Sequence, residues 1–263
     1  MHPVLFQFGG LTIYSFGVMV AIAFMVAAQW IARRAADRGW VADKAVMIAI
    51  WLLAAGLVGA KLWYALYFPA EFLADPVGML FSQGGLVWYG GLIAACLAAV
   101  ALSRWESFSI WQLGDIMMPP LALGMAIGRI GCLLAGCCYG APCDLSAIPW
   151  AIQYPAGHDT FPAHVHPAPL YESLAMVMII PMLLYADRHR KADGTTMALF
   201  FVLYGIERFI VEYFRGDRLV WMQSLNLSAS QVISIGMIVL GLGLLAWRSR
   251  KPSLKQQQPP ACC

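Results

Sequence analysis

The sequence contains few charged residues for its length. Of its 263 residues only 12% are charged, while 61% are hydrophobic, and the mean hydropathy is +0.70. Soluble domains usually contain about 25% charged residues. This shortage excludes an ordinary water-soluble core and indicates a chain that spends most of its length in lipid.

The sequence also lacks the common signals of nucleotide binding and of repeat architectures. It has no internal repeat, no Walker loop and no dinucleotide-binding fingerprint. The formal net charge of +3 gives no reason to expect nucleic acid as a partner. The start, "MHPVLFQFGG", has no charged n-region, and the apolar run that follows is long enough to remain in the membrane, so we expect no cleavable signal peptide.

Seven apolar segments approach the roughly 20 residues that a membrane crossing requires. Each should be a helix, because lipid offers no hydrogen-bond partners to the backbone. We therefore predict an all-α polytopic membrane protein, with a single seven-helix domain over residues 1–250 and a polar, flexible tail over residues 251–263. The third and fifth segments are short, so one of them is expected to be tilted or partly re-entrant. The predicted segments are Leu11–Ala32, Val46–Phe68, Leu86–Leu102, Leu113–Leu134, Leu170–Tyr185, Met197–Phe214 and Ala229–Trp247.

Basic residues predict the orientation. Most of the 17 Lys and Arg follow the first, third, fifth and seventh segments, on one side of the membrane. That side is the cytoplasm by the positive-inside rule, which places the N-terminus outside and the C-terminus inside. The basic residues on this side are Arg33, Arg34, Arg38, Lys44, Arg104, Arg188, Arg190, Lys191, Arg248, Arg250, Lys251 and Lys255.

Five basic residues remain, in or near the outer ends of the segments: Lys61, Arg129, Arg208, Arg215 and Arg218. A charge in a membrane helix costs about 2.5–3.5 kcal/mol on insertion scales, so it usually faces a partner, a cavity or water. For Lys61 and Arg218, snorkelling to the interface is the preferred interpretation.

The other arginines indicate an anion site. Arg208, Glu212 and Arg215 stand at i, i+4 and i+7, a spacing that predicts one helical face with a surplus positive charge. Arg129 lies between Gly128 and Gly131, whose missing side chains allow close approach. Because the planar guanidinium grips phosphate oxygens in a bidentate manner, the anion expected at this place is a phospholipid head group.

Four cysteines gather within 12 positions on the predicted outer side: Cys132, Cys137, Cys138 and Cys143. A disulfide, for instance Cys138 to Cys143, suits that oxidising side. A zinc or copper site is the sharper alternative, although the C-x4-C-C-x4-C spacing differs from the usual C-x2-C pairs. A membrane thiol or metal redox protein is accordingly an alternative function. Cys96, in the third segment, is expected to be a small buried apolar residue.

Several motifs, in order along the chain, carry a resemblance to a known family. They are "GGLVWYGGLIAA" (84–95), "GDIMMPPLALGMAIGR" (114–129), "GRIGCLLAGCCYG" (128–140), "HPAPLYE" (166–172) and "YGIERFIVEYFRGD" (204–217). With these motifs the chain resembles the phosphatidylglycerol–prolipoprotein diacylglyceryl transferases, seven-helix enzymes of the bacterial inner membrane. The resemblance implies transfer of a diacylglyceryl group from phosphatidylglycerol to the lipobox thiol of a prolipoprotein, with membrane lipids and prolipoprotein signal peptides as partners. It implies no cofactor and no metal, and we expect a monomer.

The resemblance also implies site residues. Arg208 stands at an essential arginine position, and Tyr89 and His166 are the other predicted catalytic residues. Arg129 is predicted to hold the phosphatidylglycerol head group. The remaining predicted lipid-binding residues are Gly128, Gly131, Gly140, Tyr171, Glu172, Glu212 and Arg215.

The chain departs from the family pattern at several positions. Tyr89 replaces a histidine, and with a reference pKa of about 10 a tyrosine is a poor base at neutral pH but a good hydrogen-bond donor. Cys132 replaces the signature asparagine, Ala135 a second asparagine, and Cys137 an acidic residue. Phe16 and Lys61 replace a tyrosine and an arginine. A phospholipid-binding protein without catalysis is therefore a further alternative, and the long loop over residues 141–169 is expected to act as a lid.

Overall fold

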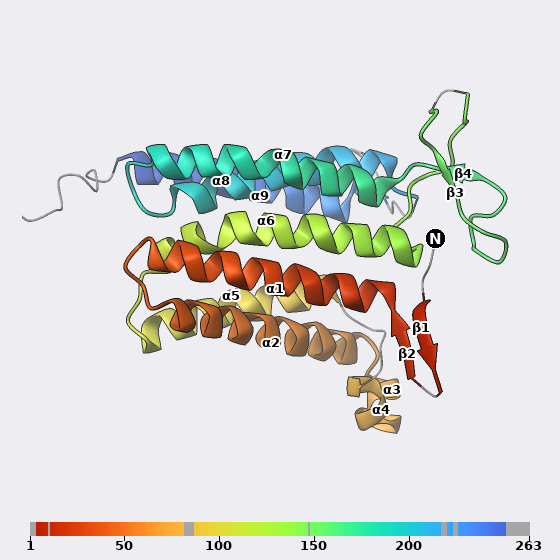
Figure 1. Ribbon diagram of the computed structural model, residues 1–263, viewed down its shortest axis with the longest axis horizontal. Coiled ribbons are helices and arrows are strands. Elements are labelled where there is room, and N and C mark those ends of the chain that lie inside the picture. The colour runs from red at the N-terminus through yellow and green to blue at the C-terminus, as the bar shows by residue number, and fades with distance from the viewer. Residues whose placement is uncertain are drawn as a thin grey trace, which may run out of the picture. The chain divides into compact units, whose positions relative to one another are not determined.

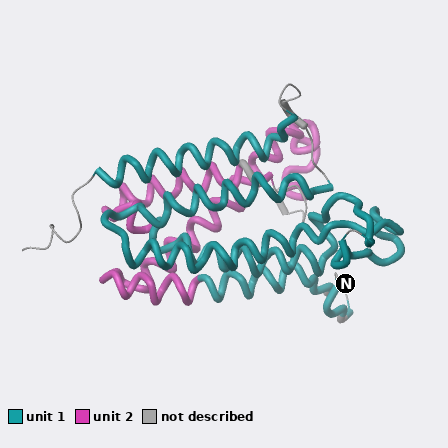
Figure 2. Tube along the Cα trace, turned by 90° about the horizontal axis from the view of Figure 1, so that it is seen from above, with its two compact units in different colours: residues 1–27, 114–263 teal, residues 28–113 magenta. Residues whose placement is uncertain are grey.

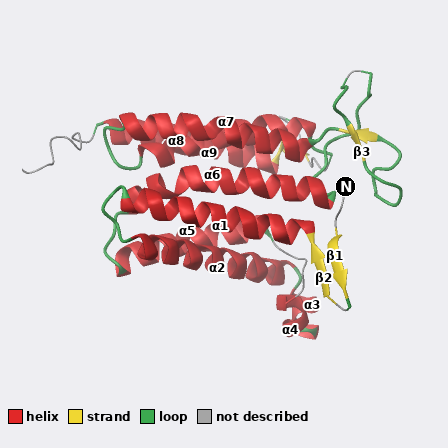
Figure 3. Cartoon of the chain, in the orientation of Figure 1, coloured by secondary structure: helices red, strands yellow, loops and turns green. Residues whose placement is uncertain are grey.

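The computed structural model describes residues 4–9, 11–81, 87–146, 148–216, 220–222 and 226–250 (Figure 1). The described chain is mostly helical, with three short antiparallel strand pairs outside the helices (Figure 3). The helices are α1 (Ser15–Ala36), α2 (Ala42–Tyr67), α3 (Pro69–Ala74), α4 (Pro76–Phe81), α5 (Trp88–Trp105), α6 (Ile110–Ala135), α7 (Ala168–His189), α8 (Thr195–Val211), the 3₁₀ turn η1 (Glu212–Phe214) and α9 (Ala229–Ser249). The strands are β1 (Val4–Phe8), β2 (Leu11–Tyr14), β3 (Ile152–Gln153), β4 (His164–Val165), β5 (Val220–Met222) and β6 (Leu227–Ser228).

A helix coincides with most of each of the seven predicted segments. In the described part of the chain five of these helices, α1, α2, α6, α7 and α9, are long and apolar enough to cross a membrane. The fifth predicted segment was too short, because α7 has 22 residues. The third is a genuinely short apolar helix, at Gly90–Trp105 within α5. The fold is thus that of a helical, polytopic membrane protein, while seven crossings and the orientation stay predictions.

Two observed helix ends differ from the predicted segment ends by three and four residues, within the roughly four residues that hydropathy leaves open. The first helix begins at Ser15 rather than Leu11, because Leu11–Tyr14 pairs with β1 as a hairpin. The sixth ends at Val211, where η1 takes over, and Arg215 is extended. The predicted 141–169 loop contains the β3–β4 pair, and its role as a lid remains a prediction.

The chain divides into two compact units, residues 28–113 and residues 1–27 with 114–263 (Figure 2). In the unit of residues 28–113, α2 and α5 pack at very short range. A Cβ atom on Gly59 would lie 2.6 Å from the carbonyl oxygen of Gly90. Such proximity is how membrane helices gain packing energy where no hydrophobic effect drives them together.

In the other unit the core lies between α6, α7 and α8. Ser173 on α7 donates a hydrogen bond to the carbonyl of Ala126 on α6, at 2.9 Å. The buried apolar residues of this core are Ala122, Ala126, Met176, Ile179, Leu183, Phe200 and Tyr204. α8 packs in turn on α9, which begins with a capping box made by Ser228 and Gln231.

Asp115, near the start of α6, is fully buried and organises the beginning of α8. Its carboxylate accepts hydrogen bonds from the backbone N–H groups of Gly194 at 2.7 Å and Met197 at 3.0 Å, and it pairs with Arg190 at 3.1 Å. Gly194 is the N-cap of α8 and has no side chain to cap the helix. A carboxylate at a helix N-terminus satisfies free amides and complements the helix dipole. Asp115 therefore supplies, from another helix, the cap that α8 lacks.

Large apolar side chains lie on the outer faces of the long helices. Trp51 on α2, Met178 on α7 and Val239 on α9 are 57%, 64% and 64% exposed. Soluble monomers rarely present apolar surface on this scale. These faces are suited to lipid, in agreement with the deficit of charge in the sequence.

Candidate functional site

Three arginines converge on one buried carboxylate, Glu172 of α7. Arg129 of α6 pairs through Nε with Glu172 Oε2. Glu172 Oε1 lies 3.5 Å from Arg208 Nη1 of α8 and 3.4 Å from Arg215 Nη1. Glu172 is only 4% exposed. The structure thus brings together residues from three of the motifs that the sequence singled out.

A second carboxylate binds the other side of Arg208. Arg208 Nη2 lies 2.9 Å from Glu212 Oε2 and donates to Ser230 Oγ at 3.3 Å. Glu212 is buried and accepts a hydrogen bond of 2.7 Å from Ser228 Oγ, the N-cap of α9. Arg208 Nη1 is buried and makes no hydrogen bond within the described residues. Arg208 is therefore held by both carboxylates, and its Nη1 has an ion-pair contact with Glu172 but no hydrogen bond within the described residues.

The expected single helical face is correct for one pair and wrong for the other. Arg208 and Glu212 pair at i, i+4. Arg215 lies beyond η1 in extended backbone and approaches from outside the helix. It reaches the same site because its backbone forms a β-bridge with Gly140. The charge surplus survives, because three guanidinium groups face Glu172 and Glu212.

Sequence reasoning missed Glu207, the neighbour of Arg208 on α8. Glu207 is 7% exposed, its Oε1 accepts no hydrogen bond within the described residues, and it lies within electrostatic reach of Glu172, Arg208 and Arg129. In the sequence, the position of Glu207 next to Arg208 was the one sign that it belongs to the site. That sign became informative only once the burial of this face of α8 was known. The site thus contains a carboxyl group with unused hydrogen-bonding capacity.

The three glycines predicted to contact lipid have different surroundings. A Cβ atom on Gly128 would meet nothing within 4 Å. One on Gly131 would lie 2.9 Å from Met19 Cβ, so this glycine lets α1 approach α6. One on Gly140 would lie 2.5–2.6 Å from atoms of His166 and Phe214. Only Gly128 leaves open space of the kind that a ligand could enter.

Gly140 lies where two distant segments cross. Its N–H donates to the carbonyl of His166 at 3.0 Å, and the N–H of Ala141 donates to the carbonyl of Phe214 at 2.8 Å. Any side chain at residue 140 would push these segments apart. They lead directly into Glu172 and Arg215, so Gly140 sets the geometry of the arginine site through the backbone.

His166 and Tyr171 form an aromatic and polar cluster beside this crossing. Tyr171 accepts a hydrogen bond of 2.8 Å from Trp150 Nε1, and its hydroxyl lies 3.2 Å from His166 Nδ1. The His166 ring packs against Phe214, with centroids 5.2 Å apart. The contact with Tyr171 engages Nδ1 of His166 and does not involve Nε2.

Other predicted residues lie elsewhere or outside the described chain. Tyr89 belongs to the first turn of α5, in the unit of residues 28–113, and its side chain is outside the described part. Arg218 also lies outside the described residues. Lys61 Nζ donates to the carbonyl of Met79 at 3.3 Å. Cys96 was expected to be buried but is exposed.

The cysteine cluster contains free thiols. Cys132, Cys137, Cys138 and Cys143 are all unbridged, so the Cys138–Cys143 disulfide is not formed. The Sγ atoms of the first three lie within 4.8 Å of one another, and Cys143 is not part of this group. Hydrogen bonds from the Cys132 and Cys137 thiols hold the pKa of Cys138 far below its ordinary value, and Arg129 and Arg215 lower it further. Hydrogen bonding to Cys132 and Cys138 raises the pKa of Cys137.

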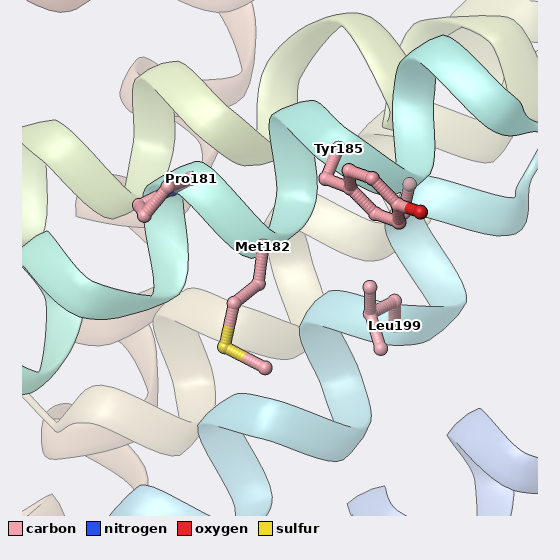
Figure 4. Close-up of a pocket in the computed structure, with 5 residues that line it drawn as sticks. Pro181, Met182, Tyr185 and Leu199 are labelled. Atoms are coloured by element: carbon pink, nitrogen blue, oxygen red, sulfur yellow. The ribbon is translucent and has the colours of Figure 1, made fainter.

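A separate cavity of about 420 Å³ lies against α7 and α8 (Figure 4). It is lined by Pro181, Met182, Tyr185, Ala186 and Leu199. This lining is almost entirely apolar and contains none of the predicted site residues. Pro181 is nine residues beyond Glu172, or about 14 Å along an α-helix. The cavity lacks charged groups that could perform chemistry on a phosphate.

Comparison with known proteins gives a consistent result. The family model described as prolipoprotein diacylglyceryl transferase matches residues 3–247. The phosphatidylglycerol–prolipoprotein diacylglyceryl transferase of Clostridium tetani is 31% identical over 242 residues, covering 92% of this chain and 96% of the relative. The transferase 2 of Clostridium perfringens is 34% identical over 247 residues, 92% and 93% of the two chains. The Pseudoalteromonas translucida transferase is 31% identical over 263 residues, 97% and 96%.

Proposed function

Because the chain belongs to the prolipoprotein diacylglyceryl transferase family, we propose that it transfers a diacylglyceryl group from phosphatidylglycerol to the lipobox cysteine thiol of prolipoproteins. One observation supports assigning this activity to particular residues: Arg129, Arg208 and Arg215 all pair with Glu172. Three partly buried guanidinium groups around Glu172 and Glu212 form a site suited to the phosphate of an anionic lipid.

The arginines serve the departure of the phosphate. The acceptor sulfur forms a bond to the glyceryl carbon that bears the phosphate, and the bond between that carbon and the phosphate oxygen breaks. Glycerol phosphate leaves with the bonding electrons, so the phosphate gains one negative charge. Arg129 and Arg208, already held by Glu172 and Glu212, are positioned to stabilise this new charge.

The acceptor thiol must lose its proton before it attacks. Nearby guanidinium groups favour the thiolate by lowering the pKa of the thiol. We assign the thiol proton to Nε2 of His166, in the tautomer whose Nδ1–H donates to the Tyr171 hydroxyl, and a hydrogen bond to the phosphate to Tyr89. Gly128 leaves room for the head group, while Gly131 and Gly140 shape the site through the backbone.

The proposal includes a cellular setting. Residues 1–250 form one transmembrane domain of seven helices that works as a monomer in the bacterial inner membrane. The N-terminus and the arginine site face outward, where secreted prolipoproteins emerge, and the tail over residues 251–263 is cytoplasmic. Phosphatidylglycerol and the prolipoprotein signal peptide approach from the lipid. The distribution of Lys and Arg in the sequence supports this orientation.

Arg208→Ala tests the proposed role. The purified variant, given phosphatidylglycerol and a lipobox peptide, should form the thioether product roughly 100- to 1000-fold more slowly, which is the usual effect of removing one group that stabilises developing charge. Arg208→Lys should retain part of the activity, because it keeps the charge but loses the bidentate geometry.

Arg104→Ala is the matched control, since Arg104 is exposed at the end of α5. Its activity should equal that of the unmodified chain. Product analysis by mass spectrometry measures all three variants. An Arg208→Ala protein that transfers at the normal rate would remove the arginine site from the reaction.

A further inference from the structure

Three thiols of the described chain form a compact group that the proposed reaction does not use. The Sγ atoms of Cys132, Cys137 and Cys138 all lie within 4.8 Å of one another. Three sulfur ligands around one metal ion, with metal–sulfur bonds of about 2.3 Å, lie about 3.8–4.0 Å apart. A contraction of less than about 1 Å would therefore bring the three sulfurs to binding distance.

The backbone turns sharply to place these thiols together. After α6 the chain reverses through Gly136, with φ +79°, and the N–H of Cys137 returns to the carbonyl of Cys132 at 3.1 Å. Cys138 has φ +57°, a left-handed conformation that residues other than glycine, asparagine and aspartate seldom adopt. The chain thus holds the third thiol in place at a conformational cost, and such costs gather at functional sites.

A buried hydroxyl points to a ligand in the same place. Tyr154 is 1% exposed, and its hydroxyl makes no hydrogen bond within the described residues. Its Cε1 atom would lie 3.4 Å from a Cβ atom on Gly136, between Cys132 and Cys137 in the chain. Tyr154 also interacts electrostatically with all three thiols.

His158 supports this arrangement from behind. Its ring stacks on Tyr154 with centroids 4.1 Å apart. Its Nε2 lies 2.8 Å from the carbonyl oxygen of Gly136 and its Nδ1 lies 2.9 Å from Thr160 Oγ1. Because both of its ring nitrogens are engaged, His158 positions Tyr154 and the turn. The ligands available to a bound ion are therefore the three sulfurs.

We propose that Cys132, Cys137 and Cys138 bind one thiophilic d¹⁰ cation, Cu(I) or Zn(II), with the Tyr154 hydroxyl donating to a bound sulfur or to a fourth ligand. Thiolates select these ions over hard cations such as magnesium and calcium. Three sulfurs suit trigonal Cu(I), while Zn(II) would take a fourth ligand. Thiols that are protonated release their protons to solvent on binding. Arg129 and Arg215, which act electrostatically on Cys138, offset the surplus negative charge.

A metal ion here would fix the end of α6. Arg129 lies one turn before Cys132, and Gly140, which bridges to Arg215, lies two residues after Cys138. The ion would clamp the turn that connects these two points and would take no part in the transfer step. The inference is independent of the proposed transferase activity, because it concerns binding alone.

Metal binding to the purified full-length protein tests the proposal. Cys96, Cys143, Cys262 and Cys263 are replaced by serine, and the reduced, chelator-treated protein is titrated with Cd(II), as a spectroscopic stand-in for Zn(II), and with Cu(I) against a competing chelator. We expect one equivalent bound as tightly as by the unmodified chain, with a sulfur-to-cadmium charge-transfer band. The titration that shows the tighter binding, Cd(II) for a zinc site or Cu(I) for a copper site, identifies the ion.

Single replacements in that background assign the ligands. Cys132→Ser, Cys137→Ser and Cys138→Ser should each weaken binding by more than the roughly 10- to 100-fold that the loss of an outer partner costs, and Tyr154→Phe should weaken it within that range. If a serine variant does not purify, the intensity of the cadmium band in the unmodified triad still counts the bound sulfurs, and three are expected.

Two outcomes would overturn the proposal. One is binding that is absent or that persists unchanged in all three serine variants. The other is a disulfide between two of these cysteines in protein purified without reductant, as found by peptide mass spectrometry, because the group would then be a redox pair rather than a cation site.

Discussion

Glu172 makes three ion pairs with one side chain that is almost inaccessible to solvent. Its partners lie 36 to 43 residues away along the chain, on either side, so no local spacing in the sequence reports the arrangement. Isolated charges are costly to bury, and each arginine is acceptable in this place because Glu172 is present. The carboxylate therefore acts as a placeholder for the negative charge that a lipid phosphate would bring.

Glu172→Gln should reveal this role in stability. The amide keeps the shape of the side chain but leaves the arginines without their shared counter-charge. Breaking a buried ion pair from one side costs about 3–5 kcal/mol, so the thermal unfolding midpoint in detergent should fall clearly. Added phosphatidylglycerol should restore part of the loss, because the lipid supplies the missing charge. An unchanged midpoint would show that the arginines do not depend on Glu172.

The thiols of the turn after α6 should differ in reactivity with pH. The pKa of Cys138 is lowered by its thiol neighbours and by Arg129 and Arg215, whereas burial raises that of Cys143. Since the thiolate is the nucleophile, iodoacetamide at pH 6 should label Cys138 in metal-free protein and leave Cys143 unmodified. Peptide mass spectrometry measures both sites in one sample. Labelling of Cys143 ahead of Cys138 would contradict the assigned order.

Some of these residue relations were predictable and others were not. The i, i+4 pairing of Arg208 with Glu212 follows from the sequence, because both belong to one helical stretch. The approach of Arg215 does not, because η1 and a backbone bridge to Gly140 replace the helix there. The grouping of Cys132 with Cys137 and Cys138, and not with Cys143, depends on a left-handed turn that cysteine does not signal.

At the scale of elements, glycine spacing controls how α8 and α9 pack. A Cβ atom on Gly241 would lie 2.7 Å from the carbonyl oxygen of Ala198 and from Val202 Cγ2. Gly243, on the same helix, would meet nothing within 4 Å. Two glycines that look alike in sequence therefore have opposite roles, one required by packing and one not.

Replacing each of these glycines by alanine separates the two roles. Gly241→Ala should destabilise the protein by about 1–3 kcal/mol, the usual cost of overpacking. Gly243→Ala should be neutral or should stabilise by up to about 1 kcal/mol, because alanine is the better helix former. Thermal unfolding in the same detergent compares them. Equal shifts for the two variants would refute the close α8–α9 contact.

The helices themselves were largely predictable, since hydropathy and length are properties of single segments. The hairpin of β1 and β2 was not, because Leu11–Tyr14 is as apolar as the helix that follows. The predicted shortness of the fifth segment failed because α7 begins two residues earlier, at Ala168, and continues past Tyr185 through Asp187, Arg188 and His189. Hydropathy locates the part of a helix that prefers lipid and does not locate its polar ends.

At the scale of the whole molecule, orientation decides which side of the membrane the arginine site faces. A fluorescent protein fused after residue 263 should fold and fluoresce, while alkaline phosphatase at the same position should be inactive, because the basic loops retain the C-terminus in the cytoplasm. A phosphatase inserted in the loop between α6 and α7 should be active. The opposite pattern would place the arginines on the cytoplasmic side and would exclude secreted prolipoproteins as acceptors.

Asp115 gives α8 a fixed register. Its bond to Met197 anchors the helix at one end, and Arg208 follows 11 residues later, about 16 Å along the axis. On α6, Arg129 follows Asp115 by 14 residues, about 21 Å, and both Arg129 and Arg208 pair with Glu172. Each inserted or deleted residue turns a helix by about 100°. The 14 residues from Asp115 to Arg129 on α6 and the 11 residues from Met197 to Arg208 on α8 thus fix the direction of each arginine. Adding or removing a residue in either stretch would turn that guanidinium group away from Glu172.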